Sequence, residues 1–152
     1  MEDPATTLPD EPVRQFSVML ANRVGAFESL MRLFQKHHIE LLGISTQDSR
    51  DATVARIVVS DPELTEQVFV EKGIPHTTSR LLVVALREAS QELLQCLHTL
   101  HIAETNIDFT YALLPHPEGR TLVAFHLEDY EFGAGVLHNA GFKILFQRDL
   151  SR

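Results

Sequence analysis

The fold is decided by one stretch near the start of the chain, residues 15–45, which reads QFSVMLANRVGAFESLMRLFQKHHIELLGIS. Its first residues alternate, so that Phe16, Val18 and Leu20 share one face of a predicted strand. Apolar side chains then recur at the spacing of a helix with one buried face, at Phe27, Leu30, Met31 and Phe34. An apolar run over residues 39–46 follows. The stretch therefore predicts a strand, a helix and another strand.

The residues that follow complete one α/β unit. A further apolar run over residues 53–59, reached after a polar stretch, predicts the partner strand of a hairpin. Asp61 and Pro62 suit the N-cap and the first position of a helix, and Gly73 supplies its stop. A short strand over residues 75–80 completes the order β-α-β-β-α-β.

The same order of elements recurs in the second half of the chain. A Val-rich strand is predicted over residues 81–86. The helix after it has a predicted buried stripe of Leu93, Leu94, Leu97 and Leu100. Setting this stripe against the stripe of the first helix places His38 over His101.

The match is closer in the second half of each copy. TVARIVVSDPEL, residues 53–64, lies over TLVAFHLEDYEF, residues 121–132, once a longer hairpin loop is allowed around residues 115–119. Gly73 then meets Gly141. A period of roughly 65 to 70 residues is longer than that of stacked repeats and indicates a duplicated domain.

Each copy has the element order of the ferredoxin-like fold, an α+β arrangement with both helices on one face of a four-stranded antiparallel sheet. We expect a flexible leader over residues 1–13 and two such domains, over residues 14–80 and 81–152. A bare sheet edge is costly, and the join between the copies is short. The two copies are therefore predicted to pack side by side in one continuous sheet of roughly eight strands, with four helices on one face.

Charge and composition exclude several classes of function. The 13 basic and 21 acidic residues give a net charge of -8, which repels a phosphate backbone, so no nucleic acid partner is expected. No apolar run approaches the roughly 20 residues that span a bilayer, and the acidic start lacks the features of a secretory signal. The single cysteine, Cys96, cannot form an intrachain disulfide. We expect a cytoplasmic protein with no membrane contact.

A turn that suits anion binding joins the first strand to the first helix. The free N–H groups and the positive dipole end of a helix N-terminus attract a carboxylate or a phosphate. Gly25 leaves the approach open because it has no side chain. A glycine here is also explained by a backbone angle alone, so the residues by themselves leave both interpretations open.

The quoted stretch resembles the opening of the ACT domains, small βαββαβ modules that bind amino acids and regulate metabolism. Asn22-Arg23-Val24-Gly25 is similar to the family's Asn-Arg-Pro-Gly-like turn. Through the repeat, the resemblance extends over residues 14–148. It implies a ligand held between this turn and the start of the second strand of a neighbouring module.

The resemblance also implies a set of site residues, with no catalytic residue, no metal and no cofactor. In it, the backbone N–H groups of the turn hold a carboxylate, the Asn22 side chain adds a hydrogen bond, and residues 103–105 cover the ligand. The implied ligand-binding residues are Asn22, Arg23, Val24, Gly25, Ala26, Phe27, Ala103, Glu104 and Thr105.

The chain departs from the family pattern at three places. Val24 stands where the turn usually has proline, and Glu40 stands where amino-acid-binding members often have asparagine. In the second copy the turn over residues 86–90 has no glycine, and Glu88 adds a charge that repels a carboxylate. We therefore expect one functional site, in the first copy.

No other residue set has the pattern of a catalytic or metal site. His98 and His101 can share a helix face, but no further ligand at matching spacing completes the three or four that zinc takes. Cys96 lies beside an apolar helix stripe, with no helix N-terminus to lower its pKa. The chain has neither a nucleophile elbow nor a phosphate-binding glycine loop, so no enzymatic activity is expected.

The sequence thus predicts a non-catalytic regulatory protein that binds a small amino acid or a similar metabolite. A homodimer is expected because a monomer would leave part of an apolar sheet face uncovered, at residues such as Val54, Ile57, Val83 and Val123. The alternative is a ligand-free ACT-like module that dimerises or docks on a metabolic enzyme. The departures from the family pattern favour that alternative.

Overall fold

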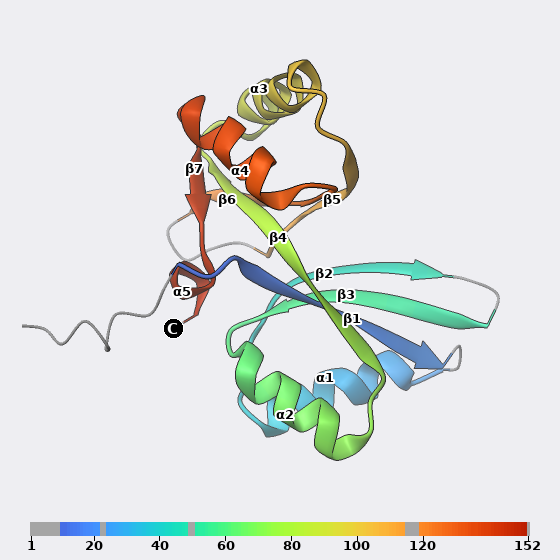
Figure 1. The fold of residues 1–152 in the computed structure, drawn as a ribbon. Helices are drawn as coiled ribbons and strands as arrows, with labels where there is room; N and C mark the ends of the chain where they lie inside the picture. Colours follow the sequence, from blue (N-terminus) through green and yellow to red (C-terminus); the bar gives the residue numbers. More distant parts are fainter. Residues whose placement is uncertain (1–9, 22–23, 49–50, 115–118, 152) are drawn as a thin grey trace, which may run out of the picture.

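Two α/β units that share one sheet make up the molecule (Figure 1). The computed structural model describes residues 10–21, 24–48, 51–114 and 119–151. Its elements are β1 (Val13–Ala21), α1 (Ala26–Lys36), β2 (Leu41–Asp48), β3 (Ala52–Val59), α2 (Pro62–Lys72), β4 (His76–Leu86), α3 (Ala89–Ile102), β5 (Ile107–Ala112), β6 (Thr121–Leu127), α4 (Tyr130–Asn139), β7 (Lys143–Leu145) and α5 (Gln147–Leu150). Each unit has the order β-α-β-β-α-β, which confirms the predicted ferredoxin-like α+β fold.

One long strand, β4, belongs to both units. Residues 76–81 of this strand pair with β1, whereas residues 82–86 pair with β6, and β7 pairs with this second part along its other edge. The sheet of the described residues therefore has seven strands, in the order β2-β3-β1-β4-β6-β5 with β7 beside β4. The continuous sheet is as predicted. It has one strand fewer than expected because the two strands predicted on either side of residue 80 are one.

The two faces of the sheet have different roles. One face carries both helix pairs, since Phe16 and Val18 pack with α1 and α2 while Leu82 and Val84 pack with α3 and α4. The sheet curls, so the two helix pairs lie at opposite ends of the molecule (Figure 1). The other face turns inward and forms a third core between the units, built from Val13, Val58, Leu81, Val83, Leu113, Leu122, Ala124, Leu145 and Leu150.

Polar and aromatic contacts join the two units at this third core. The Tyr111 hydroxyl donates to Gln15 Oε1 at 2.7 Å, and Gln15 Nε2 donates to Ser79 Oγ at 3.0 Å. The Arg56 guanidinium lies 4.0 Å from the centre of the Phe109 ring. These contacts connect β1 and β3 of the first unit to β5 of the second across the inner faces of the curled sheet.

The third core corrects the expected dimer face. Of the four residues named for that face, Val54 is half-buried, whereas Ile57 and Val83 are fully buried at 0% exposure and Val123 is 6% exposed. These three residues belong to three different core clusters, so they do not form one uncovered face. Curling covers the inner face within a single chain, and these residues give no reason for a dimer.

The second half of each unit confirms the alignment made from the sequence. Asp61 and Asp129 cap α2 and α4, and each carboxylate accepts from the backbone N–H three residues later, at 3.0 and 3.1 Å. Gly73 and Gly141 follow these helices with positive φ angles of 65° and 92°. The same caps and stops therefore delimit both helices.

The alignment of the two first helices, in contrast, is wrong by three residues. Leu94 and Leu97, predicted in the buried stripe, are 67% and 36% exposed. Two residues separate β4 from α3, and α3 has 14 residues against 11 in α1, so it carries about one extra turn at its start. Residues three positions apart lie on nearly the same face of a helix, so the predicted and the observed alignments of α3 with α1 have similar apolar patterns. The equivalent pairs are Leu30 with Cys96, Phe34 with Leu100, and His38 with Glu104.

The beginning of β1 and the end of the chain lie together. The Gln147 backbone N–H donates to the Glu11 carbonyl at 3.0 Å, and β1 begins at Val13. The predicted leader therefore gives way to bonded structure before residue 13. Residues 1–9 lie outside the described residues.

Candidate functional site

The turn between β1 and α1 presents the start of a helix without a side-chain cap. Gly25 is the N-cap residue of α1 and has a φ of 91°, a left-handed conformation that favours glycine. Its carbonyl accepts from Ser29 N–H at 2.9 Å. Among the described residues, none accepts from the backbone N–H groups of Ala26 and Phe27. These two donors remain available to a ligand. Asn22 and Arg23 of the predicted site lie outside the described residues.

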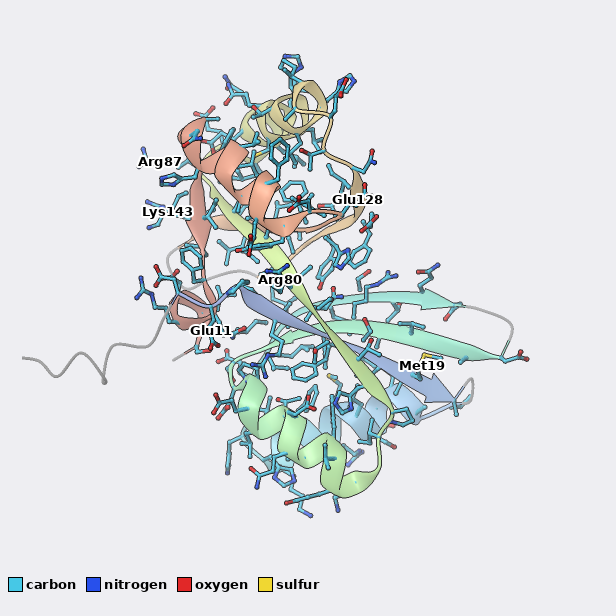
Figure 2. All side chains as sticks on the ribbon, viewed as in Figure 1. Glu11, Met19, Arg80, Arg87, Glu128 and Lys143 are labelled. Carbon is cyan, nitrogen blue, oxygen red and sulfur yellow. The ribbon has the colours of Figure 1, made fainter. Side chains whose placement is uncertain are left out.

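This helix start opens onto a groove of about 740 Å³. One wall is the turn itself with the end of β1, where Met19 lies (Figure 2). The other wall is the turn between α2 and β4, which the Met19 N–H contacts by donating to the Pro75 carbonyl at 3.3 Å. The lining residues are Met19, Leu20, Ala21, Val24, Gly25, Ala26, Ser29, Leu30, Leu33, Lys72, Gly73, Ile74 and Pro75.

The electrostatics of the groove suit a carboxylate. Lys72 is the one charged side chain among its described lining residues, and the N-terminal end of α1 adds partial positive charge. Apolar side chains, among them Met19, Leu33 and Ile74, lie beside the polar backbone groups of the two turns. An anionic group beside an apolar surface is the combination that a small amino acid or a related carboxylic acid would match.

The second predicted segment lies elsewhere in the chain. Glu104 and Thr105 form the turn between α3 and β5, where Glu104 has a positive φ of 54°. With Arg80, Asn106, Glu128, Asp129, Tyr130 and Phe132 they line a different groove of about 510 Å³. Met19 of the first groove and Glu128 of the second lie in different units (Figure 2). The two grooves share no described lining residue, so one chain does not bring the two predicted segments together.

The corresponding turn of the second unit is closed by its own chain. Only two residues separate β4 from α3. The backbone N–H groups of Arg87 and Glu88 both donate to the Glu92 carboxylate. A carboxylate of the protein therefore binds the backbone of this turn and places negative charge at the start of α3, where it would repel a ligand carboxylate.

The sequence did not indicate the wall formed by residues 72–75. Gly73 signalled only the end of a helix. The signal was in the topology, because the ferredoxin-like order places β4 beside β1, as the pairing of Val18 with His76 shows. The turn before β4 must then lie next to the end of β1, where the predicted ligand turn begins.

Neither Cys96 nor the histidine pair of α3 lines the groove beside Gly25. Cys96 is fully buried in the core of the second unit, and burial raises the pKa of its thiol to about 12. His98 and His101 lie on the exposed side of α3. Within the described ranges, no three His, Cys, Asp or Glu side chains come together as metal ligands would.

Comparison with known proteins identifies the family of this architecture. No helix in the described part of the chain has the length and apolar character needed to cross a membrane. Among solved structures, protein BT0572 from Bacteroides thetaiotaomicron superposes with a TM-score of 0.84 at 18% identity, over 93% of this chain and 96% of that one. The ligand-free regulatory subunit of aspartate kinase from Thermus thermophilus gives 0.58 at 12% identity, over 87% and 94%. The aspartokinase alpha and beta subunits give 0.55 at 16% identity, over 86% and 93%.

Structural similarity at these identities establishes the fold alone. A search of curated protein sequences gives no significant match. The family model for the ACT domain pair, however, matches residues 11–152, which is nearly the whole chain. The chain belongs to the ACT domain pair family.

Proposed function

We propose that this protein is a non-catalytic regulatory module that binds a small amino acid or a similar carboxylate metabolite in the groove beside Gly25. The observation that carries the proposal is the uncapped start of α1, where Gly25 and Ala26 line a groove with one lysine and several apolar side chains, and Phe27, the next free donor, follows outside the lining residues. Membership of the ACT domain pair family supports a regulatory role. The structural similarity to a regulatory subunit of aspartate kinase is consistent with it.

In this proposal the ligand carboxylate accepts from the N–H groups of Ala26 and Phe27 and pairs with Lys72. Its side chain lies against the apolar wall. Cover from residues 103–105, as the family resemblance implies, requires a second copy of the chain, because in one copy none of the three lines the Gly25 groove, and Glu104 and Thr105 line another. We therefore propose a cytoplasmic homodimer whose ligand links two copies.

Regulation follows from differential affinity. A ligand that bridges two modules stabilises the arrangement in which both contact it. It can shift the equilibrium between arrangements by no more than the difference between its affinities for them. The information then reaches a partner enzyme, or the protein's own assembly, as a change in which surfaces are exposed.

A thermal-shift screen against the twenty amino acids tests the proposal. A ligand at a hundredfold excess over its Kd stabilises the folded protein by about 2.7 kcal/mol. Gly25→Leu is expected to abolish this stabilisation, because a side chain at a groove-lining position occupies ligand space. If none of the twenty amino acids stabilises the wild-type protein, the amino-acid proposal is wrong.

Gly141→Leu is the matched control. Gly141 has a φ of 92° against 91° at Gly25, and an added Cβ meets no atom within 4 Å at either position. Both variants therefore carry a similar backbone cost, on the order of 1–2 kcal/mol. Only the Gly25 variant is expected to lose ligand stabilisation, and Ser90→Leu at the closed turn of the second unit is expected to retain it.

A ligand-free interaction module is the second candidate function. The observation that favours it is the exposure of apolar side chains that line the groove, since Val24 is fully exposed and Met19 is 51% exposed. If this surface is an interface, Met19→Lys should convert a dimer to a monomer in light scattering without any ligand. If the wild-type protein is a monomer at micromolar concentration, the homodimer prediction fails.

A further inference from the structure

His76, the first residue of β4, holds two hydrogen bonds directly behind one wall of the Gly25 groove. Its Nδ1 lies 2.9 Å from the Ile74 carbonyl oxygen, which belongs to that wall. Its Nε2 lies 3.0 Å from Glu66 Oε2 on α2. Both partners are acceptors, and a neutral imidazole has only one N–H. Only the protonated ring can therefore donate to both.

Among the described residues around the ring, Glu66 is the one charged group that faces it. From α2, Glu66 contacts the ring, and the Phe69 ring lies 5.1 Å away between centres. From β1, the residue paired with His76 is Val18, and the Phe16 ring lies 5.9 Å away. The wall residues that follow Lys72 are uncharged. The His76 side chain is 12% exposed, so little water can hydrogen-bond to the ring in place of Ile74 and Glu66.

We propose that His76 is a pH-sensitive latch, whose protonated ring ties the groove wall at Ile74 to α2 and whose deprotonation releases that wall. Loss of the proton removes one of the two donors, so either the Ile74 carbonyl or the Glu66 carboxylate loses its partner. The wall at residues 72–75 then has one fewer tie to α2. The effect on ligand binding rests on the proposed function of the groove, whereas the latch itself operates without a ligand.

The direction of the pH dependence follows from the same contacts. The Ile74 carbonyl, against the opposing effect of burial and with help from the Glu66 carboxylate, holds the pKa of His76 above its ordinary value of 6.5. A folded-state pKa above the unfolded value gives stability that is fully present below pH 6.5. That stability is lost as the pH rises through the folded-state pKa. The ligand affinity of the groove should fall over the same interval.

The second unit supplies an internal control. Alignment of the two caps and stops places Ile144 at the position that His76 occupies, and Ala134 at the position of Glu66. The equivalent turn around Gly141 therefore has no titrating latch. A pH effect confined to the first of these two turns cannot come from a general change in the fold.

An NMR titration of the ligand-free protein between pH 5.5 and 9 tests the latch. We expect the His76 ring resonance to titrate above pH 6.5, and Glu66→Gln to lower that midpoint. The Met19 amide, which donates to Pro75 in the wall, should exchange faster above the midpoint than its intrinsic pH dependence explains. The Gly141 amide, which donates to the His138 carbonyl, should show only the intrinsic dependence.

Urea unfolding over the same pH range gives an independent measurement. The wild-type midpoint should fall as the pH rises through the His76 titration, and His76→Gln should lose this fall. His126→Gln is the control, because it removes a histidine that contacts a carboxylate, Asp108, in the second unit. It should leave the His76 resonance and its titration unchanged.

Two results would overturn the latch. One is a native His76 ring that titrates at or below pH 6.5, and the other is a Met19 amide with only intrinsic pH dependence. Both measurements use the wild-type protein, so they hold even if His76→Gln does not fold. Neither involves a ligand, so a failed amino-acid screen with an intact latch would refute the proposed function alone.

Discussion

Replacing Tyr111 with phenylalanine tests whether the two units are held together by a specific polar contact. The Tyr111 hydroxyl donates to Gln15 Oε1 at 2.7 Å, and Gln15 is 1% exposed. Tyr111→Phe therefore leaves a buried acceptor without its donor, which costs about 1–3 kcal/mol of unfolding free energy. For a chain of this size, each kcal/mol lowers Tm by roughly 2–4 °C.

The other tyrosine of the chain is a matched control. The Tyr130 hydroxyl is buried, and it has no hydrogen-bond partner among the described residues. Tyr130→Phe removes the same atom without orphaning an acceptor, so its effect is expected to be within about 0.5 kcal/mol or stabilising. Burial raises the pKa of both phenols, so both hydroxyls are desolvated, and the difference between them is that only the Tyr111 hydroxyl has a hydrogen-bond partner.

Urea unfolding followed by circular dichroism measures both variants. We expect Tyr111→Phe to lower the midpoint clearly and Tyr130→Phe to leave it in place. Adding Gln15→Met to Tyr111→Phe should recover part of the loss, because both polar partners are then absent. Equal effects of the two tyrosine substitutions would refute the argument that the Tyr111 contact joins the units.

Three further outcomes follow from individual contacts. Asp61→Ala and Asp129→Ala should each lower the free energy of unfolding by about 0.5–2 kcal/mol in thermal unfolding, since each removes one N-cap. A loss outside this range for only one of the two variants would mean that the caps are not equivalent. Cys96 should react with a thiol reagent only on unfolding, because it is fully buried and its pKa is raised to about 12; rapid labelling of the native protein would contradict this. Gly43→Val should lower Tm, because an added Cβ at Gly43 lies within clashing distance of the Leu113 side chain where β2 meets the end of β5. An unchanged Tm would show that the Leu113 side chain moves aside.

Local sequence patterns were sufficient to predict a helix boundary where one residue type has one dominant structural role. Asp61 and Asp129 before two helices, and Gly73 and Gly141 after them, could be aligned from the sequence because caps and stops act on neighbouring backbone groups. The buried stripe of α3 could not, because apolar residues fill several neighbouring positions of that helix and a shift of three residues keeps the pattern. Only packing against the sheet selects Cys96 and Leu100 for burial.

Of the two walls of the candidate groove, the sequence indicated only the turn around Gly25. The turn around Gly25 was found from its glycine and its position before a helix, both of which are local signals. Lys72, Ile74 and His76 approach it only because β4 pairs with β1, so their sequence distance from Gly25 hid them. The latch at His76 depends further on Glu66 of α2, which is distant in sequence from every residue of the predicted site.

The sequence by itself determined the duplicated βαββαβ order, the family resemblance and the glycine turn before the first helix. These features depend on local periodicity and on residues a few positions apart. The tertiary structure alone decided that one strand serves both units, that the sheet curls around a third core, and that Glu104 and Thr105 line a groove other than the one beside Gly25. The physical reason is that curvature and strand sharing depend on how inward-facing side chains from distant strands, such as Tyr111 and Gln15, fit together.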